Sequence, residues 1–237
     1  MAEADYEVAL DSRGDWHRNI VSLRHSIDLF ADLVTDPAHT HVLIRHEITT
    51  KPTRGAVPIL QRPFERAEFY DPIASALNWP FIHPAATRYS AGHFGVWYGA
   101  RTLETSVFET VYHFRRDTLA SQIARESSKP IFQERRVHLV HCEAMLIDLR
   151  ARCAADPRLI ADDYAYCQAL GAQLRAASLP GVITRSARDP SGIVIGVFER
   201  SALSQPRDVC FLTYTLHPDT HRVDVERAVG RVAWRVP

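Results

Sequence analysis

The chain has no excess of charge of either sign, since 28 Lys and Arg residues balance 28 Asp and Glu residues. Proteins that bind nucleic acid usually carry a basic excess, so the balance argues against direct nucleic-acid binding. No apolar run approaches the roughly 20 residues that span a bilayer. The acidic start MAEADYEVAL lacks the basic and apolar regions of a signal peptide. We therefore expect a cytoplasmic protein that has no contact with a membrane.

Cysteine is scarce, and the common nucleotide and metal motifs are missing. The four Cys residues form no CxxC pair, which favours reduced thiols over a disulfide framework. The sequence contains no GxGxxG, P-loop, GxSxG or HExxH motif. His217 and His221 have the spacing of two zinc ligands, but Pro218 and Asp219 favour a turn between them, and no third ligand has a convincing spacing. We expect no metal site.

The order of the predicted elements indicates an α+β fold with a mixed twisted sheet and flanking helices. Apolar residues recur at spacings of three and four from Trp16 to Val34, which predicts an amphipathic helix over 15–34. We interpret residues 1–38 as an N-terminal helical extension and 39–237 as the main domain. The helix packs either on the core of its own domain or against a partner, a homodimer included.

The main domain shows strand patterns on both sides of two helical patterns. Residues 41–46 predict a strand, and the proline-rich segment 49–87 predicts a long loop with short helical pieces near 66–77. Asp156-Pro157 predicts the start of a helix that continues past Leu174. Further strands are predicted at 137–142, 144–149, 182–184, 193–198, 209–216 and 229–236.

The stretch from Arg88 to Phe114 joins a glycine-containing turn, a strand and a helix. Residues 96–98 have a strand composition, and Thr102 is the predicted N-cap of a helix over 103–114. This order places Arg88, Tyr98 and Glu109 within reach of one cleft. A cation, a phenol and a carboxylate can bind an anionic nucleotide and act on a glycosidic bond.

Each of these residues also has an ordinary structural interpretation. Arginine is mostly exposed, and a strand tyrosine such as Tyr98 is commonly a core aromatic. Glu109 lies almost opposite the apolar positions of its helix, which predicts a solvated face. Ser186 lies in a loop rich in proline and glycine, where serine favours turns.

Several blocks of the chain resemble the RES domain family, which is named for an arginine, a glutamate and a serine. Ile44-Arg45 resembles the first arginine of the family, at the end of an early strand. Arg88 and the segment GVWYGA at 95–100 resemble the second arginine block of the family. Two features depart from the usual pattern: His46 after the first arginine, and the turn Ala86-Thr87-Arg88-Tyr89. The remaining similar blocks are ETSVFE at 104–109, QALG at 168–171 and GVITRSAR at 181–188.

The resemblance implies an ADP-ribosyltransferase-like RES fold and a toxin of a bacterial toxin–antitoxin pair. Such toxins consume NAD as a substrate, by hydrolysis or phosphorolysis of the nicotinamide–ribose bond, and no metal is needed. The implied partner is an Xre-type helix-turn-helix antitoxin. The alternatives are a protein ADP-ribosyltransferase, a nucleotide-binding module of the same fold without catalysis, and a protein-interaction domain without a small ligand. The residues that the resemblance assigns to the NAD site are Arg45, His46, Arg88, Tyr98, Glu109 and Ser186.

The implied roles agree with the chemistry of these side chains. A planar guanidinium binds phosphate by paired charge-assisted hydrogen bonds, which suits Arg45 and Arg88 to the pyrophosphate of NAD. Ser186 would offer its hydroxyl to a phosphate or ribose. Glu109 would stabilise the oxocarbenium-like cation that forms as the glycosidic bond breaks. Tyr98 would stack on or orient the nicotinamide or ribose.

Overall fold

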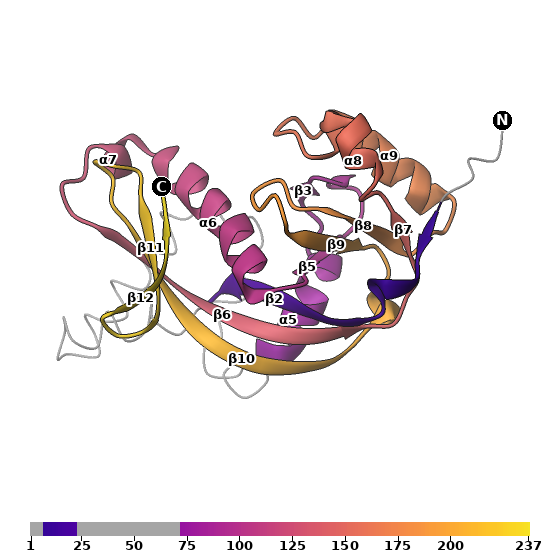
Figure 1. Ribbon diagram of the computed structural model, residues 1–237, viewed down its shortest axis with the longest axis horizontal. Coiled ribbons are helices and arrows are strands. Elements are labelled where there is room, and N and C mark those ends of the chain that lie inside the picture. The colour runs from indigo at the N-terminus through magenta and orange to yellow at the C-terminus, as the bar shows by residue number, and fades with distance from the viewer. Residues whose placement is uncertain (1–6, 23–71) are drawn as a thin grey trace, which may run out of the picture.

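The structure, a computed structural model, describes residues 7–22 and 72–237 and is organised around one mixed sheet (Figure 1). Ten described strands follow the order β1-β7-β8-β9-β5-β2-β6-β10-β11-β12. Neighbouring strands are antiparallel except β7 and β8, which are parallel. The mixed sheet with flanking helices confirms the predicted α+β class.

The sheet contains β1 (Val8–Ala9), β2 (Gly14–Val21), β5 (Trp97–Ala100), β6 (Ile131–Cys142), β7 (Leu146–Asp148), β8 (Gly181–Arg185), β9 (Ile193–Val197), β10 (Leu203–Leu216), β11 (Val223–Ala228) and β12 (Arg231–Val236). A separate hairpin pairs β3 (Ala86–Thr87) with β4 (Ser90–Ala91). The helices are η1 (Leu10–Ser12), α5 (Pro72–Ile82), α6 (Leu103–Leu119), α7 (Gln122–Arg125), α8 (Arg152–Ala155), η2 (Pro157–Leu159), α9 (Ala165–Ala176) and η3 (Arg200–Ala202).

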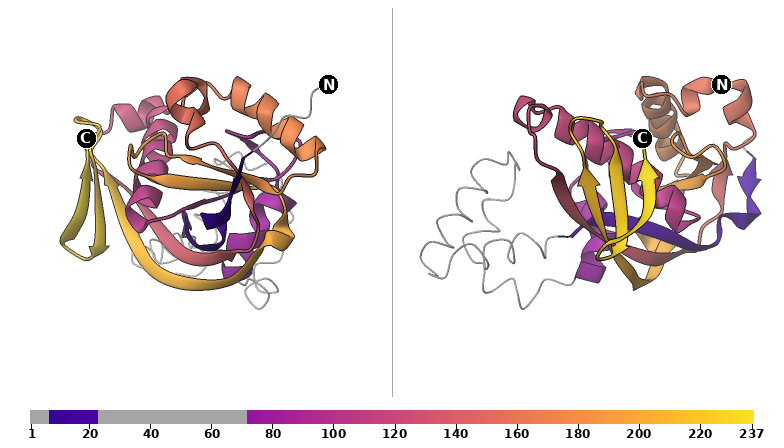
Figure 2. Two further views of the ribbon diagram at one scale, coloured as in Figure 1. Left: turned by 45° about the vertical axis from the view of Figure 1, so that its right-hand side comes forward. Right: turned by 60° about the vertical axis from the view of Figure 1, so that its left-hand side comes forward.

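The long strands β6 and β10 bend into a deep curve, and α6 lies across the concave side (Figures 1 and 2). Two register shifts interrupt their pairing, between Ser204 and Arg207 and between Asp208 and Cys210. Irregular pairing of this kind bends a strand and increases its twist. The apolar face of α6 fills the curve with Val107 and Val111, which pack against β6 and β10.

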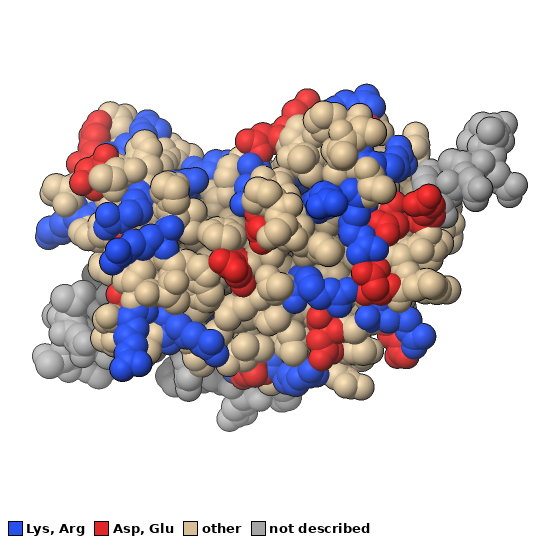
Figure 3. Space-filling view, in the orientation of Figure 1, with Lys and Arg blue, Asp and Glu red and all other residues tan. Residues whose placement is uncertain are grey.

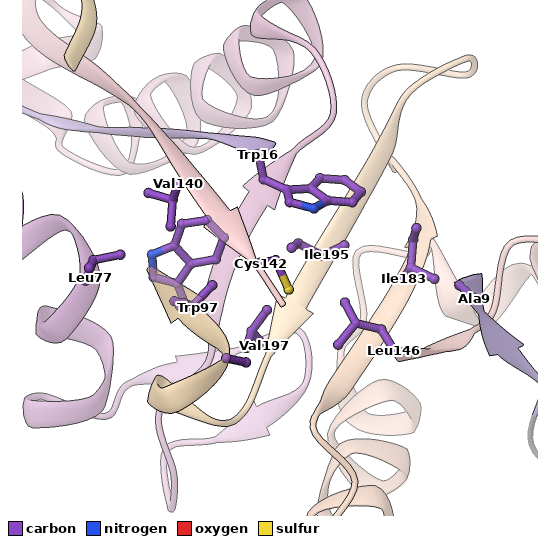
Figure 4. Packing of buried hydrophobic residues seen from close by; sticks show 12 residues of the cluster. Ala9, Trp16, Leu77, Trp97, Val140, Cys142, Leu146, Ile183, Ile195 and Val197 are labelled. Atoms are coloured by element: carbon purple, nitrogen blue, oxygen red, sulfur yellow. The ribbon is translucent and has the colours of Figure 1, made fainter. Parts of the chain in front are cut away.

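A second core lies under the middle of the sheet and is built around two tryptophans (Figure 4). Trp16 and Trp97 have no exposed surface. Their indole N–H groups donate to the carbonyl oxygens of Ser12 and Ala76 at 2.9 Å each. Because each buried indole nitrogen has an acceptor, the rings add apolar contact without leaving an unpaired donor.

The prediction of a helix over 15–34 is wrong for the described residues of that range, because Gly14–Val21 form the central strand β2. Trp16 packs into the core on one face, while Asn19 is buried on the other and donates to the Tyr214 hydroxyl at 3.0 Å. Trp16 and Ile20, the apolar positions of the predicted helix within β2, lie on one face of the strand. Their spacing of four fits a strand face as well as a helix face. β1 and β2 belong to the main sheet, so residues 7–22 are no separate helical extension. Residues 23–34 and the boundary predicted at 38 and 39 lie outside the described residues.

Other differences occur at element boundaries. The segment 72–82 forms α5 where mostly loop was expected, and the rest of the predicted loop up to 71 lies outside the described residues. The helix predicted to start at Asp156-Pro157 is two elements, η2 and α9, separated by residues 160–164. Asp156 caps η2 by accepting from the Arg158 N–H, as its position predicted. The β8–β9 hairpin is confirmed, whereas β11 was not predicted.

All four cysteines fall in the described residues and are free. Among the described residues, no helix is long and apolar enough to cross a bilayer.

Candidate active site

The β3–β4 hairpin presents Arg88 at its two-residue turn. The half-buried guanidinium donates from Nη1 to the carbonyl oxygens of Leu159 and Ala161, at 3.3 and 2.6 Å. Its Cζ lies 4.6 Å from the centre of the Tyr164 ring, a distance typical of a cation–π contact. Arg88 is therefore held against the loop formed by residues 160–164.

Tyr98 fixes the turn that carries Arg88. Its hydroxyl accepts from the backbone N–H of Tyr89 and is hydrogen-bonded to Thr87 Oγ1, at 3.1 Å each. Burial raises the pKa of Tyr98 to about 12, so the phenol is protonated at neutral pH. Because the hydroxyl bonds to both neighbours of Arg88, Tyr98 orients the hairpin turn. This contact differs from the direct contact with nicotinamide or ribose that we expected.

Helix α9 supports the same hairpin from the other side. Gln168 Nε2 donates to the carbonyl oxygen of Thr87 at 2.9 Å. Gly171 packs directly on the hairpin, where an added Cβ would lie 2.0 Å from the carbonyl oxygen of Tyr89. The glycine thus permits a helix–hairpin approach that any side chain would block. The block QALG at 168–171 therefore holds the Arg88 turn in place.

Glu109 on α6 contacts the loop that joins β8 and β9. The helix begins where predicted, because Thr102 accepts a hydrogen bond from the Thr105 N–H. Glu109 Oε1 accepts from Ser186 Oγ at 2.5 Å and from the Ala187 N–H at 3.2 Å. The carboxylate is therefore half-buried and oriented, although the helical periodicity predicted a solvated face.

Ser186 uses its whole hydrogen-bonding capacity within the loop at 186–192. Its hydroxyl donates to Glu109 and accepts from the N–H groups of Arg188 and Asp189, at 3.0 and 2.9 Å. A hydroxyl has one donor and two acceptor sites, and the residue is only 4% exposed. The structure thus makes Ser186 a residue that positions Glu109, in contrast to the free hydroxyl we expected to meet a phosphate or ribose.

Arg188 is a site residue that the sequence reasoning did not assign. Its guanidinium stacks on the Tyr112 ring, 3.3 Å from the ring centre, and forms an ion pair with Asp162. Burial lowers the pKa of Arg188, but the hydrogen bond and charge of Asp162 outweigh it and raise the pKa, with smaller contributions from Tyr112 and Glu109. The block GVITRSAR at 181–188 could have identified Arg188 as a site residue, because Arg188 follows Ser186 by two positions in it.

Arginine charges act on two titratable groups of the site. Burial is the main cause that lowers the pKa of His113 to about 4, and the charges of Arg116, Arg188 and Arg88 contribute to this lowering. The hydrogen bond from Arg188 is the largest cause that lowers the pKa of Asp162, and the charge of Arg88 also contributes. Arg88 contacts Ala161 and Arg188 contacts the adjacent Asp162, so the two guanidinium groups belong to one site.

The structure brings four of the six predicted site residues into this neighbourhood. Arg88, Tyr98, Glu109 and Ser186 come from the hairpin, β5, α6 and the β8–β9 loop, whereas Arg45 and His46 lie outside the described residues. The surface is indented between the part containing α6 and α7 and the part containing α8, and basic side chains lie in this indentation (Figure 3). Among the described residues, no group of three or more His, Cys, Asp or Glu side chains is placed to hold a metal ion.

This arrangement has two chemical capacities. The guanidinium groups can bind an anion such as a pyrophosphate. The described hydrogen bonds to Glu109 both end on Oε1, so Oε2 can face a bound molecule and stabilise positive charge there.

Comparisons with known proteins identify the family. No curated protein matches the sequence. The fold is similar to a chain in the crystal structure of the M. tuberculosis MbcT–MbcA toxin–antitoxin complex, with 18% sequence identity, a TM-score of 0.37, and coverage of 57% of this chain and 74% of that chain. A family model described as RES domain matches residues 59–235. Because this match covers most of the sequence, the chain belongs to the RES domain family.

Proposed function

We propose that this protein cleaves the nicotinamide–ribose bond of NAD, as the toxin of a toxin–antitoxin pair. The observation that carries the proposal is the oriented carboxylate of Glu109. Ser186 and Ala187 hold its Oε1, and Ser186 also accepts from the backbone N–H of Arg188. The site therefore combines an anion-binding part with a negative charge, which a dinucleotide with a cationic nicotinamide ring requires.

The proposed reaction divides these roles between the residues. Arg188 and Arg88 bind the pyrophosphate of NAD. As the bond between the nicotinamide nitrogen and the ribose C1′ breaks, its electron pair leaves with nicotinamide, and the ribose becomes an oxocarbenium-like cation. The Oε2 atom of Glu109 stabilises that cation and bonds the ribose hydroxyls. Tyr98 and Ser186 act by positioning Arg88 and Glu109.

An acceptor then completes the reaction at C1′. Water gives ADP-ribose, and inorganic phosphate gives ADP-ribose 1″-phosphate. Membership of the RES domain family supports two further parts of the proposal. The protein acts in the cytoplasm, and an Xre-type helix-turn-helix antitoxin inhibits it. Arg45 and His46 remain proposed contacts to NAD.

The test is nicotinamide release from NAD by the purified protein, with and without phosphate, with products identified by mass. Glu109→Gln keeps the shape and an oxygen that can accept from Ser186, but it removes the negative charge. We expect this variant to lose about a hundredfold or more in turnover, the scale of a lost transition-state electrostatic contact. The control is Glu104→Gln, which removes an exposed carboxylate from the same helix and should keep wild-type turnover.

The alternative outcomes are distinct. Undiminished turnover by Glu109→Gln contradicts the role of the carboxylate. Nicotinamide release accompanied by a mass gain on a protein identifies an ADP-ribosyltransferase. Calorimetric binding of NAD by the wild type without any nicotinamide release identifies a binding module that has no catalysis.

A further inference from the structure

One short loop, residues 160–164 between η2 and α9, contacts both guanidinium groups of the candidate site. Arg88 donates to the carbonyl oxygen of Leu159, the last residue of η2, and to that of Ala161 in the loop. Arg188 forms an ion pair with the carboxylate of Asp162. The two cations that would bind an anionic substrate are thus already in contact with oxygen atoms of the protein.

The pairing of Arg188 with Asp162 is incomplete. Only Nη2 of Arg188 contacts the carboxylate, through Oδ1. Among the described residues, the Nε atom of Arg188 is buried and has no hydrogen-bond partner. A guanidinium binds a phosphate most strongly through two parallel N–H donors. A phosphate in place of Asp162 can therefore take both Nη2 and Nε, and it would satisfy a donor that Asp162 leaves unpaired.

Asp162 can leave Arg188 without disturbing the core. Its side chain is 63% exposed, whereas that of Arg188 is 16% exposed. The loop is anchored by Leu159, which has no exposed surface. Rotation of the Asp162 side chain into solvent is enough to free Arg188, and the backbone can stay in place.

We propose that Asp162 is a built-in competitor of the substrate, which occupies the phosphate position on Arg188 in the free protein and is displaced when an anionic ligand binds. We call the contact of Asp162 with Arg188 the Asp162 latch. The identification of that ligand as the pyrophosphate of NAD rests on the proposed function. The latch itself requires only that a phosphate group binds to Arg188.

The test measures phosphate binding separately from catalysis. Inorganic pyrophosphate is titrated by calorimetry into the wild type and into Asp162→Asn, which keeps the side-chain shape and removes the competing charge. We expect pyrophosphate to bind about two- to fivefold more tightly to the variant, since an ion pair with one exposed partner is a weak competitor. Asp162→Glu should stay near the wild type.

The control is Glu143→Gln, which removes an exposed carboxylate paired with Arg13 at 3.0 Å on another part of the molecule. This variant loses the same charge as Asp162→Asn and should bind pyrophosphate as the wild type does. Weaker binding by Asp162→Asn would show that Asp162 orients Arg188 for its ligand and would overturn the latch. Equal binding by the wild type and Asp162→Asn, or no binding by either, would overturn it as well.

The Michaelis constant for NAD separates the two proposals. If the wild type releases nicotinamide, Asp162→Asn should lower the KM for NAD by the same two- to fivefold factor. If the wild type is inert toward NAD while Asp162→Asn binds pyrophosphate more tightly, the latch stands and the proposed reaction is wrong. If nicotinamide is released and neither KM nor pyrophosphate affinity changes, the reaction stands and the latch is wrong.

Discussion

Ser186→Ala tests whether the orientation of Glu109 depends on one hydroxyl. The substitution removes the bond from Ser186 Oγ to Glu109 Oε1. It also removes the acceptor for the backbone N–H groups of Arg188 and Asp189. The Ala187 N–H, 3.2 Å from Oε1, is the contact to Glu109 that remains within this loop.

The size of the effect follows from the kinds of bonds lost. A hydrogen bond to a charged group contributes about 1.5–3 kcal/mol, and a neutral one about 1 kcal/mol. Water can replace part of the lost bonding at the rim of the loop, so we expect the free energy of unfolding to fall by about 2–4 kcal/mol. If the bond to Glu109 acts fully in the transition state, kcat/KM for NAD falls about 10- to 100-fold.

The assay combines urea unfolding with nicotinamide release. The matched control is Ser191→Ala in the same loop, where the exposed hydroxyl donates to Asp189 Oδ1 at 3.0 Å and the Ser191 N–H still reaches that oxygen at 3.1 Å. This control should keep both stability and turnover near the wild type. Wild-type stability and turnover in Ser186→Ala would refute the argument that the hydroxyl holds the carboxylate.

Two further predictions concern α9 and α6. Gly171→Ala places a Cβ 2.0 Å from the Tyr89 carbonyl oxygen and should lower the free energy of unfolding by about 1–3 kcal/mol. An increase of about 1 kcal/mol, the usual effect of replacing glycine with alanine in a helix, would show that the hairpin can move away from α9. His113 has its pKa lowered from 6.5 to about 4 by burial, so the folded state binds fewer protons than the unfolded state between these values. Its contribution therefore makes stability fall as pH decreases from about 6.5 to about 4, and His113→Gln should show a smaller loss between pH 7 and 5 in urea titrations. An equal loss in both proteins would mean that His113 does not carry this dependence.

The local elements of the site were predictable because their signals are short-range. The N-cap Thr102, the apolar stripe of α6 and the β8–β9 hairpin all appear as predicted. A cap or a hairpin depends on residues a few positions apart, so sequence spacing is enough to find it. The break between η2 and α9 was missed because residues 157–174 continue a helical pattern, while the interruption at 160–164 depends on contacts with Arg88 and Arg188.

The strand β2 was mispredicted for a different physical reason. A strand in the middle of a sheet with both faces covered does not alternate between buried and exposed residues. Trp16 and Asn19 are buried on opposite faces of β2. The helix was predicted from Trp16 and Ile20, whose spacing of four also places both residues on one face of a strand. The covering layers come from α6 and from the core around Trp97, which are distant in the sequence.

The sequence by itself determined the family and the chemical groups of the site, since the blocks around Arg88, Glu109 and Ser186 keep their order and composition. Only the tertiary structure decided which of these groups remains open to a ligand. It directs the Ser186 hydroxyl to Glu109 and the Tyr98 hydroxyl to the two residues that flank Arg88, and it places Asp162 on Arg188. Hydrogen-bond partners depend on distances between segments far apart in the chain, and the spacing of residues along a sequence does not specify those distances.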